Sequence, residues 1–399
     1  MTAAWPTIPL GQLVDGGELS YGIVQPGGAE SGGVPIVRVK DLNRGSVDTR
    51  SALRVAPSVS ARHSRTVLRG GEVLVSVVGT VGETAVVTQS LAGWNVARAI
   101  AVVRPKGVSP QWIRLALQTG PVQNTLKGVL NTTVQATLNL ADLKRLRIPM
   151  PPEPTRKAIV DMLGALDDKI AANDRQLRLA EQLADTLHLA VAREAHATGL
   201  TFDDVAEVGG GGTPRTSVDE YWGGDISWAT PTDITALRAP YLNATSRTIT
   251  DAGLQACASS LYPVGSILMT SRATIGAFAI AEVPLAVNQG FIVVNAKNPA
   301  FQWWLFHEMR SRVQEFLAYA NGATFLELPR GRFKTLALNP PSTYAVRKFD
   351  EAVRPLHVHA ALVVHENGHL DSARDELLPL LMSGELSVKD ADHVVEGIV

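Results

Sequence analysis

The chain contains the same sequence pattern twice, with the two copies about 190 residues apart, and each copy ends in a long helical segment. The first copy comprises the runs 36–42, 73–76, 79–82, 131–133 and 148–152. The second comprises the runs 226–234, 267–270, 272–276, 322–324 and 338–341. A repeat of this length indicates one structural unit used twice. The chain is therefore predicted to have two similar domains and two similar binding faces.

The composition is that of a globular protein with a substantial core. The chain has 399 residues, 45% of them apolar, which is enough for two domains that each bury a core. Its single cysteine, Cys257, excludes an intramolecular disulfide. No apolar run reaches the length of a membrane span, and residues 1–10 lack the basic residues of a signal peptide. We therefore expect a cytoplasmic protein.

Charge is distributed unevenly between the two copies. Residues 1–150 contain 16 Lys and Arg against 8 Asp and Glu, a net of about +8, and Arg62, Arg65 and Arg69 lie close together. Residues 199–340 contain 10 against 12, a net of about −2. A basic first domain favours nucleic acid as a partner, although ordinary surface charge explains it equally well. The second domain has no such support, which counts against a symmetric DNA binder.

The segment that follows each copy has the period of packed helices. A helix is expected from Glu153, and apolar residues then recur at Ile159, Leu163, Leu166, Ile170, Leu177, Ala180, Ala184, Leu187 and Val191, with Asn173 in one position of the series. The second segment has Phe349, Val353, Leu356, Ala360, Val363, Asn367, Leu370, Arg374, Leu377 and Leu381. These heptad seams predict two long helices packed as an antiparallel coiled coil.

A helix over 159–191 would be about 50 Å long at 1.5 Å per residue, so the pair would act as a spacer between the domains. Pro355 lies inside the second seam and is expected to kink or restart that helix. The alternative is a pair of ordinary amphipathic core helices.

Both copies are predicted to be mixed α/β domains, which gives an α+β fold with a pseudo-two-fold internal repeat. Short β-branched segments between turns predict strands over 34–39, 72–78, 84–87 and 99–103, and over 266–270, 277–281 and 291–294. Helices are expected over 110–127 and 301–320. The glycines at 209–212 lack the ending of a phosphate-binding P-loop and are interpreted as a turn. The expected order is domain 1–150, helix 151–197, domain 198–341, helix 342–386 and tail 387–399.

Several motifs closely resemble those of the specificity subunit of type I restriction–modification enzymes. In the second copy they are Gly212-Thr213-Pro214-Arg215-Thr216, Tyr221-Trp222-Gly223-Gly224-Asp225-Ile226, Trp228, Thr230-Pro231, Asp233-Ile234 and Asn288-Gln289-Gly290, which are similar to a target-recognition domain of that family. The run 166–170 with Asn173 resembles its central helix, and 374–379 with 382–386 resembles its C-terminal helix. The resemblance covers essentially the whole chain. The first copy departs from it, with only Gly33-Val34-Pro35-Ile36 where the Tyr-Trp-Gly-Gly block stands.

The resemblance implies a subunit without chemistry of its own. Two tandem target-recognition domains, separated by the helical spacer, would each read one half of a split target in double-stranded DNA. The implied protein partners are two methyltransferase (modification) subunits, joined for restriction by translocase–nuclease subunits. S-adenosylmethionine, ATP and magnesium would belong to those partners, and this chain would bind no cofactor.

Candidate DNA contacts are loop side chains that can reach phosphates or base edges. They are Arg38, Lys40, Asn43, Arg44, Arg62 and Arg65 in the first domain, and Thr213, Arg215, Thr216, Tyr221, Trp222, Arg272 and Gln289 in the second. Structural roles are open for each of them, because an aromatic ring can simply pack a turn and an arginine can pair with an acid. The candidate spacer contacts are Leu163, Leu166, Ile170, Leu177, Val353, Leu356, Val363 and Leu370.

One motif favours a different class of protein. His365-Glu366-Asn367-Gly368-His369 has the spacing of a zinc metallopeptidase, which is kept as an alternative function, with His365 and His369 as ligands and Glu366 as general base. Asn367 and Leu370 occupy the seam, however, so both histidines fall on the flanks of a solvated helix. A coiled-coil scaffold that binds no DNA is a third hypothesis.

Two further motifs are weaker signals. Asn339-Pro340-Pro341 resembles part of the loop of amino-group DNA methyltransferases, but Ser342 stands where an aromatic residue is required, and the run is interpreted as the exit of a strand before a helix. Trp303 and Trp304, with Phe301 and Phe306, can stack on bases but are expected to form core.

Overall fold

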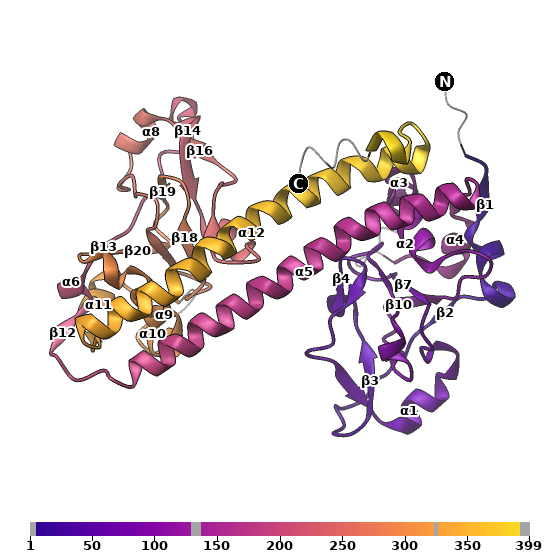
Figure 1. The fold of residues 1–399 in the computed structure, drawn as a ribbon, viewed down its shortest axis with the longest axis horizontal. Helices are drawn as coiled ribbons and strands as arrows, with labels where there is room; N and C mark the ends of the chain where they lie inside the picture. Colours follow the sequence, from indigo (N-terminus) through magenta and orange to yellow (C-terminus); the bar gives the residue numbers. More distant parts are fainter. Residues whose placement is uncertain (1–4, 129–136, 323–325, 392–399) are drawn as a thin grey trace. The chain divides into compact units, whose positions relative to one another are not determined.

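The chain forms two compact units, each of which contains one globular part and a segment of both long helices (Figure 1). Unit 1 combines Met1–Ala171 with Gly368–Val399, and unit 2 is Ala172–Asn367. The structure is a computed structural model that describes residues 5–128, 137–322 and 326–391. The repeat runs 131–133 and 323–324 therefore lie outside the described residues.

The globular part of unit 1 contains two main sheets. One is antiparallel, in the order β2 (Ser20–Tyr21), β10 (Ile100–Val103), β7 (Val73–Ser76) and β8 (Thr84–Val86). The other has the order β6 (Leu53–Val55), β3 (Val34–Val37) and β9 (Asn95–Val96), with β3 and β9 parallel. The strand pairs β1 (Thr7–Pro9) with β11 (Arg147–Pro149) and β4 (Leu42–Asn43) with β5 (Ser46–Val47) complete it, together with the helices α1 (Pro57–Arg62), α2 (Pro110–Gln118), α3 (Gly120–Gly128) and α4 (Leu140–Arg145).

Unit 2 repeats this arrangement. Its larger sheet has the order β13 (Ala206–Gly209), β20 (Phe291–Ala296), β17 (Ile267–Thr270), β18 (Phe278–Ala281) and β15 (Tyr241–Leu242). Its smaller sheet has the order β16 (Thr248–Ile249), β14 (Trp222–Ala229) and β19 (Leu285–Val287), with β14 and β19 parallel. The pair β12 (Leu200–Thr201) with β21 (Ala337–Leu338) and the helices α6 (Phe202–Val205), α7 (Pro231–Thr235), α8 (Asp251–Gln255), α9 (Gln302–Ser311), α10 (Val313–Ala318) and α11 (Arg330–Lys334) complete it.

The repeat extends to individual backbone contacts. Gly22 and Gly211 occupy equivalent positions, because a Cβ at Gly22 would lie 2.1 Å from the carbonyl oxygen of Val96, and one at Gly211 would lie 1.8 Å from that of Val287. Only glycine allows so close an approach of two backbones. The turn after the central strand of the smaller sheet is also shared, since Asp41 and Asp233 each accept a hydrogen bond from the backbone three residues earlier, at 2.8 and 2.7 Å.

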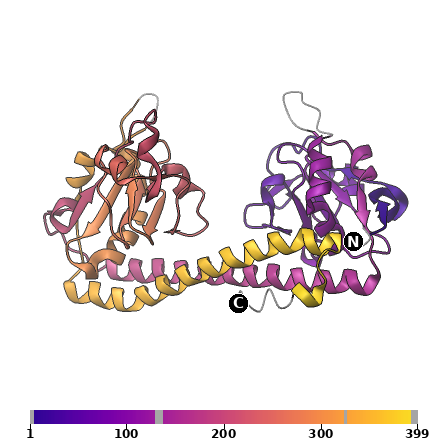
Figure 2. The ribbon, with the colours of Figure 1, turned by 90° about the horizontal axis from the view of Figure 1, so that it is seen from above.

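Long helices α5 (Glu153–Ala192) and α12 (Thr343–Ser383) run antiparallel to each other within each unit (Figures 1 and 2). In unit 1 the beginning of α5 packs on the end of α12, and Leu163, Leu166, Ile170, Leu370, Leu377 and Leu381 share one core. In unit 2 the end of α5 packs on the beginning of α12, and the core contains Leu177, Ala184, Val353, Leu356 and Ala360. Val363 is buried as well. The antiparallel pairing of the two seams is therefore confirmed.

The structure differs from the predicted helices at three points. Pro355 does not restart the second long helix, because α12 continues through it without interruption, while a kink there stays a prediction. Pro355 lies on the exposed face, where water can solvate the carbonyl that loses its hydrogen bond. The segment 110–127 is two helices, since Thr119 is extended (ψ 145°) and Pro121 cannot donate the hydrogen bond that would continue α2. Segment 301–320 is likewise divided into α9 and α10 at Arg312.

Candidate nucleic-acid interface

In unit 2 several loops adjoin at one edge of the two sheets. The hydroxyl of Thr213 donates a hydrogen bond to Oε1 of Gln289 at 2.7 Å, and this joins the loop after β13 to the loop between β19 and β20. The backbone N–H of Ser271 donates to the carbonyl oxygen of Gly290 at 2.7 Å, which adds the loop after β17. Ser271 in turn accepts from the N–H of Leu328 at 2.9 Å. The segments 210–216, 271–274, 288–290 and 326–330 are therefore neighbours.

Beside these loops, an arginine lies over the ring of a tryptophan. The guanidinium carbon of Arg247 lies 3.5 Å from the ring centroid of Trp222. Trp222 packs edge-on against Trp228 with ring centroids 5.1 Å apart, and Trp228 donates through its indole N–H to the carbonyl oxygen of Gly212 at 3.1 Å. The indole N–H of Trp222 donates to the carbonyl oxygen of Arg215 at 3.3 Å. Trp222 therefore packs the turn and also fixes Arg247, which remains exposed.

The other candidate residues of the second domain have mixed environments. Arg215 and Thr216 are exposed on the loop after β13. Tyr221 is partly buried, and its carbonyl oxygen accepts from the N–H of Thr250 at 3.1 Å. Arg272 forms an ion pair with Glu327 at 2.8 Å, in which both side chains are 42% exposed. The acid partner foreseen for Arg272 is thus present, and it leaves much of the guanidinium open to solvent.

The candidate residues of the first domain are partly engaged in ion pairs and partly exposed. Arg38 is occupied by Asp41, to which its Nε and a terminal nitrogen each donate at 2.9 Å. Arg44 forms a bidentate ion pair with Asp371 on helix α12 of the same unit, with one contact at 2.7 Å, so it anchors the globular part to the helix. Lys40, Asn43, Arg62 and Arg65 are exposed.

Three exposed arginines were not found by sequence reasoning, two beside these loops and one at the equivalent place in unit 1. Arg247 covers Trp222, and Arg330 lies so close to Gly210 that a Cβ there would be 2.9 Å from its terminal nitrogen. The third is Arg98, which precedes Ala99. The carbonyl oxygen of Ala99 accepts a hydrogen bond from the N–H of Val77 at 2.8 Å, and the carbonyl oxygen of Gly290 accepts the corresponding bond from Ser271. Arg98 is therefore the equivalent of Gln289 in the first domain. Aligning residues 95–103 with residues 286–294 in the sequence reveals the correspondence of Arg98 with Gln289.

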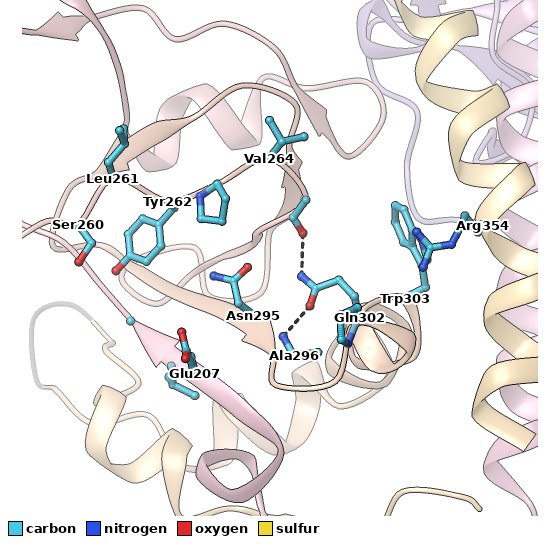
Figure 3. A pocket seen from close by; sticks show the side chains of 15 residues that line it. Glu207, Ser260, Leu261, Tyr262, Val264, Asn295, Ala296, Gln302, Trp303 and Arg354 are labelled. Carbon is cyan, nitrogen blue, oxygen red and sulfur yellow. Dashed lines mark hydrogen bonds between the residues drawn. The ribbon is translucent and has the colours of Figure 1, made fainter. Parts of the chain in front are cut away.

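A pocket of unit 2 is separate from these loops. It has a volume of about 710 Å³ and lies between the loop 260–265, the strands β13 and β20, and the helices α9 and α12. Figure 3 shows Gln302 fixed at its edge by hydrogen bonds to the carbonyl oxygen of Gly265 (2.7 Å) and the N–H of Ala296 (2.6 Å). None of the candidate DNA contacts lines this pocket.

The metallopeptidase hypothesis finds no support in the structure. His365 is paired with Glu282 at 3.1 Å and lies 3.3 Å from Asn243 through its other ring nitrogen. Glu366, the proposed general base, accepts a hydrogen bond from Asn173 of helix α5 at 2.8 Å. Within the described parts of the chain, no group of three His, Cys, Asp or Glu side chains is placed to hold a metal ion.

The two weaker motifs have structural roles. The run 339–341 connects β21 to α12, as expected for the exit of a strand before a helix. Phe301, Trp304 and Phe306 are buried core, whereas Trp303 is partly buried against His357. Across residues 5–128, 137–322 and 326–391, no helix combines the length and apolarity needed to cross a membrane.

Comparison with known proteins identifies the family. A profile described as the type I restriction modification DNA specificity domain matches residues 27–182 and again residues 200–347. The chain belongs to this family. Each match covers most of one globular part and continues into, or begins just after, a long helix.

Curated relatives agree with this assignment. The chain is 39% identical over 141 residues to the type I restriction enzyme MjaIX specificity subunit of Methanocaldococcus jannaschii, a match that covers 35% of this chain and 33% of that one. It is 28% identical over 185 residues to the type I restriction enzyme EcoBI specificity subunit of Escherichia coli, which covers 46% of this chain and 39% of the relative. The matches thus span little more than a third of the relatives' length.

The fold also has a known counterpart. The S subunit of a type I restriction–modification system from M. genitalium superposes with a TM-score of 0.57 at 15% sequence identity, over 95% of this chain and 96% of that one. At this identity the likeness concerns the fold alone. It supports the predicted α+β architecture of two specificity domains and two long helices.

Proposed function

We propose that this chain is the DNA-recognition subunit of a type I restriction–modification system, and that each globular part reads one half of a bipartite target. The observation that carries the proposal is the double match of the specificity-domain profile, over 27–182 and 200–347, to two parts whose corresponding strands have the same order, with β15 added in unit 2. Two like domains in one chain suit a target with two parts. The net charge of about +8 in residues 1–150 supports contact with phosphates.

The loops of unit 2 offer the groups that such reading requires. Base edges in the major groove are distinguished by paired donors and acceptors, for which Arg, Gln, Asn and Thr side chains are suited. Thr213 and Gln289 hold each other in place, and Arg247 is ordered by Trp222 before any ligand binds. Ordering these side chains in advance reduces the entropy lost on binding. In the first domain, Arg98 occupies the position equivalent to Gln289 and is exposed.

Catalysis is assigned in this proposal to other subunits. The chain would hold two methyltransferase subunits and, for restriction, translocase–nuclease subunits on the DNA. S-adenosylmethionine, ATP and magnesium would be bound by those subunits. A cytoplasmic location belongs to the same proposal. The assignment of catalysis to other subunits draws on the resemblance to type I specificity subunits, including those of M. jannaschii and E. coli.

The test is a binding and methylation experiment on the full chain with its methyltransferase partner. We expect weak binding of the chain alone, and tight binding of the complex to one bipartite sequence. Affinity should fall roughly a thousandfold or more between 50 and 200 mM salt if about six phosphates are contacted. Sequencing of methylated adenines in cells that carry both subunits should reveal two half-sites with a fixed gap. Equal affinity of the complex for all duplexes would refute the proposal.

A further inference from the structure

A continuous chain of four hydrogen-bonded side chains joins the globular part of unit 2 to both long helices. Tyr241 of β15 contacts Nδ1 of His357 on α12 through its hydroxyl at 2.8 Å. Nε2 of His357 lies 2.9 Å from Nε2 of His307 on α9. Nδ1 of His307 lies 2.8 Å from Oδ1 of Asp185 on α5. Two of the four groups belong to the globular part and two belong to the helix pair.

The protons of this chain can be arranged in one way when Asp185 is ionised. A carboxylate only accepts, so Nδ1 of His307 must carry a proton and donate it to Asp185. Nε2 of neutral His307 then accepts from Nε2–H of His357, and Nδ1 of His357 accepts from the hydroxyl of Tyr241. Every donor is matched with an acceptor as long as both imidazoles are neutral. A second proton on either ring adds a fourth hydrogen to three contacts, so one donor, either an N–H or the hydroxyl of Tyr241, is left without an acceptor within the chain.

The surroundings of the chain favour the neutral rings. His307 and His357 are 1% and 5% exposed, and Trp303 stacks on His357 at 3.8 Å between ring centroids. Burial lowers the pKa of both histidines, that of His357 to about 3, and the positive charge of Arg310 acts in the same direction. Asp185 opposes this shift but does not reverse it. Burial raises the pKa of Asp185, but the hydrogen bond with His307 and the positive charge of Arg310 lower it by more, so the net shift of the pKa is downwards.

The other charged or titratable groups around the chain come from every element packed against it. They are Glu181 and His188 on α5, Glu308 and Arg310 on α9, and Glu282 after β18. Glu181 neutralises Arg310 at 2.5 Å, and Glu308 lies 3.2 Å from the ring of His188. The carboxylates of Glu181 and Glu308 are thus engaged by Arg310 and His188 rather than by His307 or His357.

The equivalent contact in unit 1 is built from groups of another kind. Asp167 follows Leu166 on α5 as His357 follows Leu356 on α12, so the two occupy the same place in the two seams. Asp167 binds Arg114 of α2 and Arg374 of α12, each at 2.6 Å. Arg374 also donates to Gln118 at 2.7 Å. Leu115 of α2 is the counterpart of His307, because each residue follows a buried tryptophan, Trp112 or Trp304, by three positions. Unit 1 has no histidine in this network.

We propose that His307 and His357 are positioning residues that hold the second globular part on the helix pair only while both are neutral, so that acid loosens this part and leaves the first attached. Histidine is the residue type whose ordinary titration falls between pH 5 and 8. The inference does not depend on the proposed function, because it concerns contacts within the chain. If the chain does read a bipartite target, acid would impair the second half-site first.

The sign of the pH effect follows from the lowered pKa values. An unfolded or detached histidine takes up a proton near pH 6.5, whereas buried His307 and His357 do not. The detached state therefore binds more protons below pH 6.5, and acid favours it. The contact is at full strength above about pH 6.5 and weakens as the pH falls towards the lowered values. From pH 7.5 to 5.5 the opening constant should rise about tenfold for His357, and the lowered pKa of His307 should add to that rise.

Hydrogen exchange of the full chain tests the proposal without DNA or a partner. Peptides over 241–242 and 302–311 report on unit 2, and peptides over 110–118 report on unit 1. After correction for intrinsic exchange rates, the unit 2 peptides should lose at least tenfold protection between pH 7.5 and 5.5, and the unit 1 peptides should change less than twofold. Equal protection of the unit 2 peptides at both pH values would overturn the proposal.

Variants separate titration from packing. In His307→Gln/His357→Gln each amide keeps one donor and one acceptor but cannot take up a proton. This variant should lose the pH effect in unit 2, even if its protection at pH 7.5 is lower. The matched control is His359→Gln on the exposed face of α12, which should keep the wild-type profile. A pH effect that persists in the double glutamine variant would sink the idea.

A second measurement applies if the double variant fails to fold. Ring resonances of the nine histidines can be followed by NMR in the unmodified chain. The ring of His357 should not titrate above pH 5, and the ring of His307 should titrate below the ordinary range of histidine; the single variants His307→Gln and His357→Gln identify the two resonances. Ordinary titration of both rings near pH 6.5, with unit 2 still protected, would contradict the proposal.

Discussion

Asn173 on helix α5 donates a hydrogen bond to the side-chain carbonyl of Asn367 on helix α12 at 2.9 Å, inside an otherwise apolar seam. The two side chains are 1% and 6% exposed. Asn367 in turn donates to Asp174 at 3.0 Å, and Asn173 also donates to Glu366. Polar pairs of this kind fix the register of a coiled coil, because any shift leaves a buried amide without a partner.

Removing one member of this pair should destabilise unit 2. Asn173→Leu leaves the buried carbonyl of Asn367 without its donor, so the free energy of unfolding should fall by about 1–3 kcal/mol. The double variant Asn173→Leu/Asn367→Leu should recover most of that loss, because two apolar partners can replace a polar pair. Urea unfolding followed by circular dichroism measures both. Exposed Gln182→Leu on the same helix is the control and should change stability by less than about 0.5 kcal/mol. A single variant as stable as the double one would contradict this account.

Arg247 should contribute to DNA affinity through its preorganised position. Arg247→Ala removes a cation held 3.5 Å from the ring of Trp222, and affinity for the target duplex should fall about tenfold or more. Trp222→Phe keeps an aromatic ring under the guanidinium and should have a smaller effect. Fluorescence anisotropy with the assembled complex gives both values. Arg347→Ala on the exposed face of α12 serves as a charge-matched control. Equal losses for Arg247→Ala and Arg347→Ala would show that only net charge matters.

Arg98 and Gln289 should act on different halves of the target. They occupy equivalent turns, as the matching hydrogen bonds of Ala99 and Gly290 indicate. Arg98→Ala should weaken binding through the first half-site, and Gln289→Ala should weaken binding through the second. Duplexes in which one half-site at a time is scrambled distinguish the two effects. If both substitutions weakened binding equally on duplexes whose second half-site is scrambled, Arg98 and Gln289 would not act on separate half-sites.

The histidines of the zinc-like motif should be dispensable for DNA modification. His369 is exposed, so His369→Ala should be neutral. His365→Ala removes the partner of Glu282, but His365 is 41% exposed and the loss of stability should stay under about 1 kcal/mol. Metal analysis and a methylation assay on the double variant test this. Stoichiometric zinc in the unmodified protein, lost with activity in the variant, would revive the metallopeptidase hypothesis.

Elements whose residues recur at a regular spacing along the sequence were predictable, whereas contacts between residues that only the folded chain brings together were not. The seams could be read from the alternating spacings, including Asn173 and Asn367 inside them, because helix packing repeats along the sequence. The β-branched runs gave the main strands for the same reason. The expected restart at Pro355 was wrong, because packing of Val353, Leu356 and Ala360 in the core of unit 2 keeps the helix continuous on both sides of the proline.

The candidate site was predictable only in part. Charge and loop position make Arg38 and Arg44 candidate DNA contacts. The sequence does not reveal that Arg44 pairs with Asp371, which is 327 residues away. The pairing of Arg38 with Asp41 is local and could have been anticipated from the capping spacing. Arg247 becomes notable only when β14 and β16 bring it over Trp222. The DNA contacts of all these residues remain predictions.

The long helices should determine the gap between the two half-sites. Four residues inserted into α5 after Ala171 and into α12 after Asn367 fall at the boundaries between the two units along the sequence, so the contacts within each unit are kept. Such an insertion lengthens the pair by about 6 Å, which corresponds to one to two steps of 3.4 Å along DNA. The tolerated gap should grow by one or two base pairs, while the half-site sequences stay the same because the parts that read them are untouched. Insertion into only one helix is the matched control and should destabilise the pair, because the seams no longer match. Genome-wide mapping of methylated sites measures gap and half-sites together. An unchanged gap, or altered bases in either half-site, would show that the helices do not set the distance.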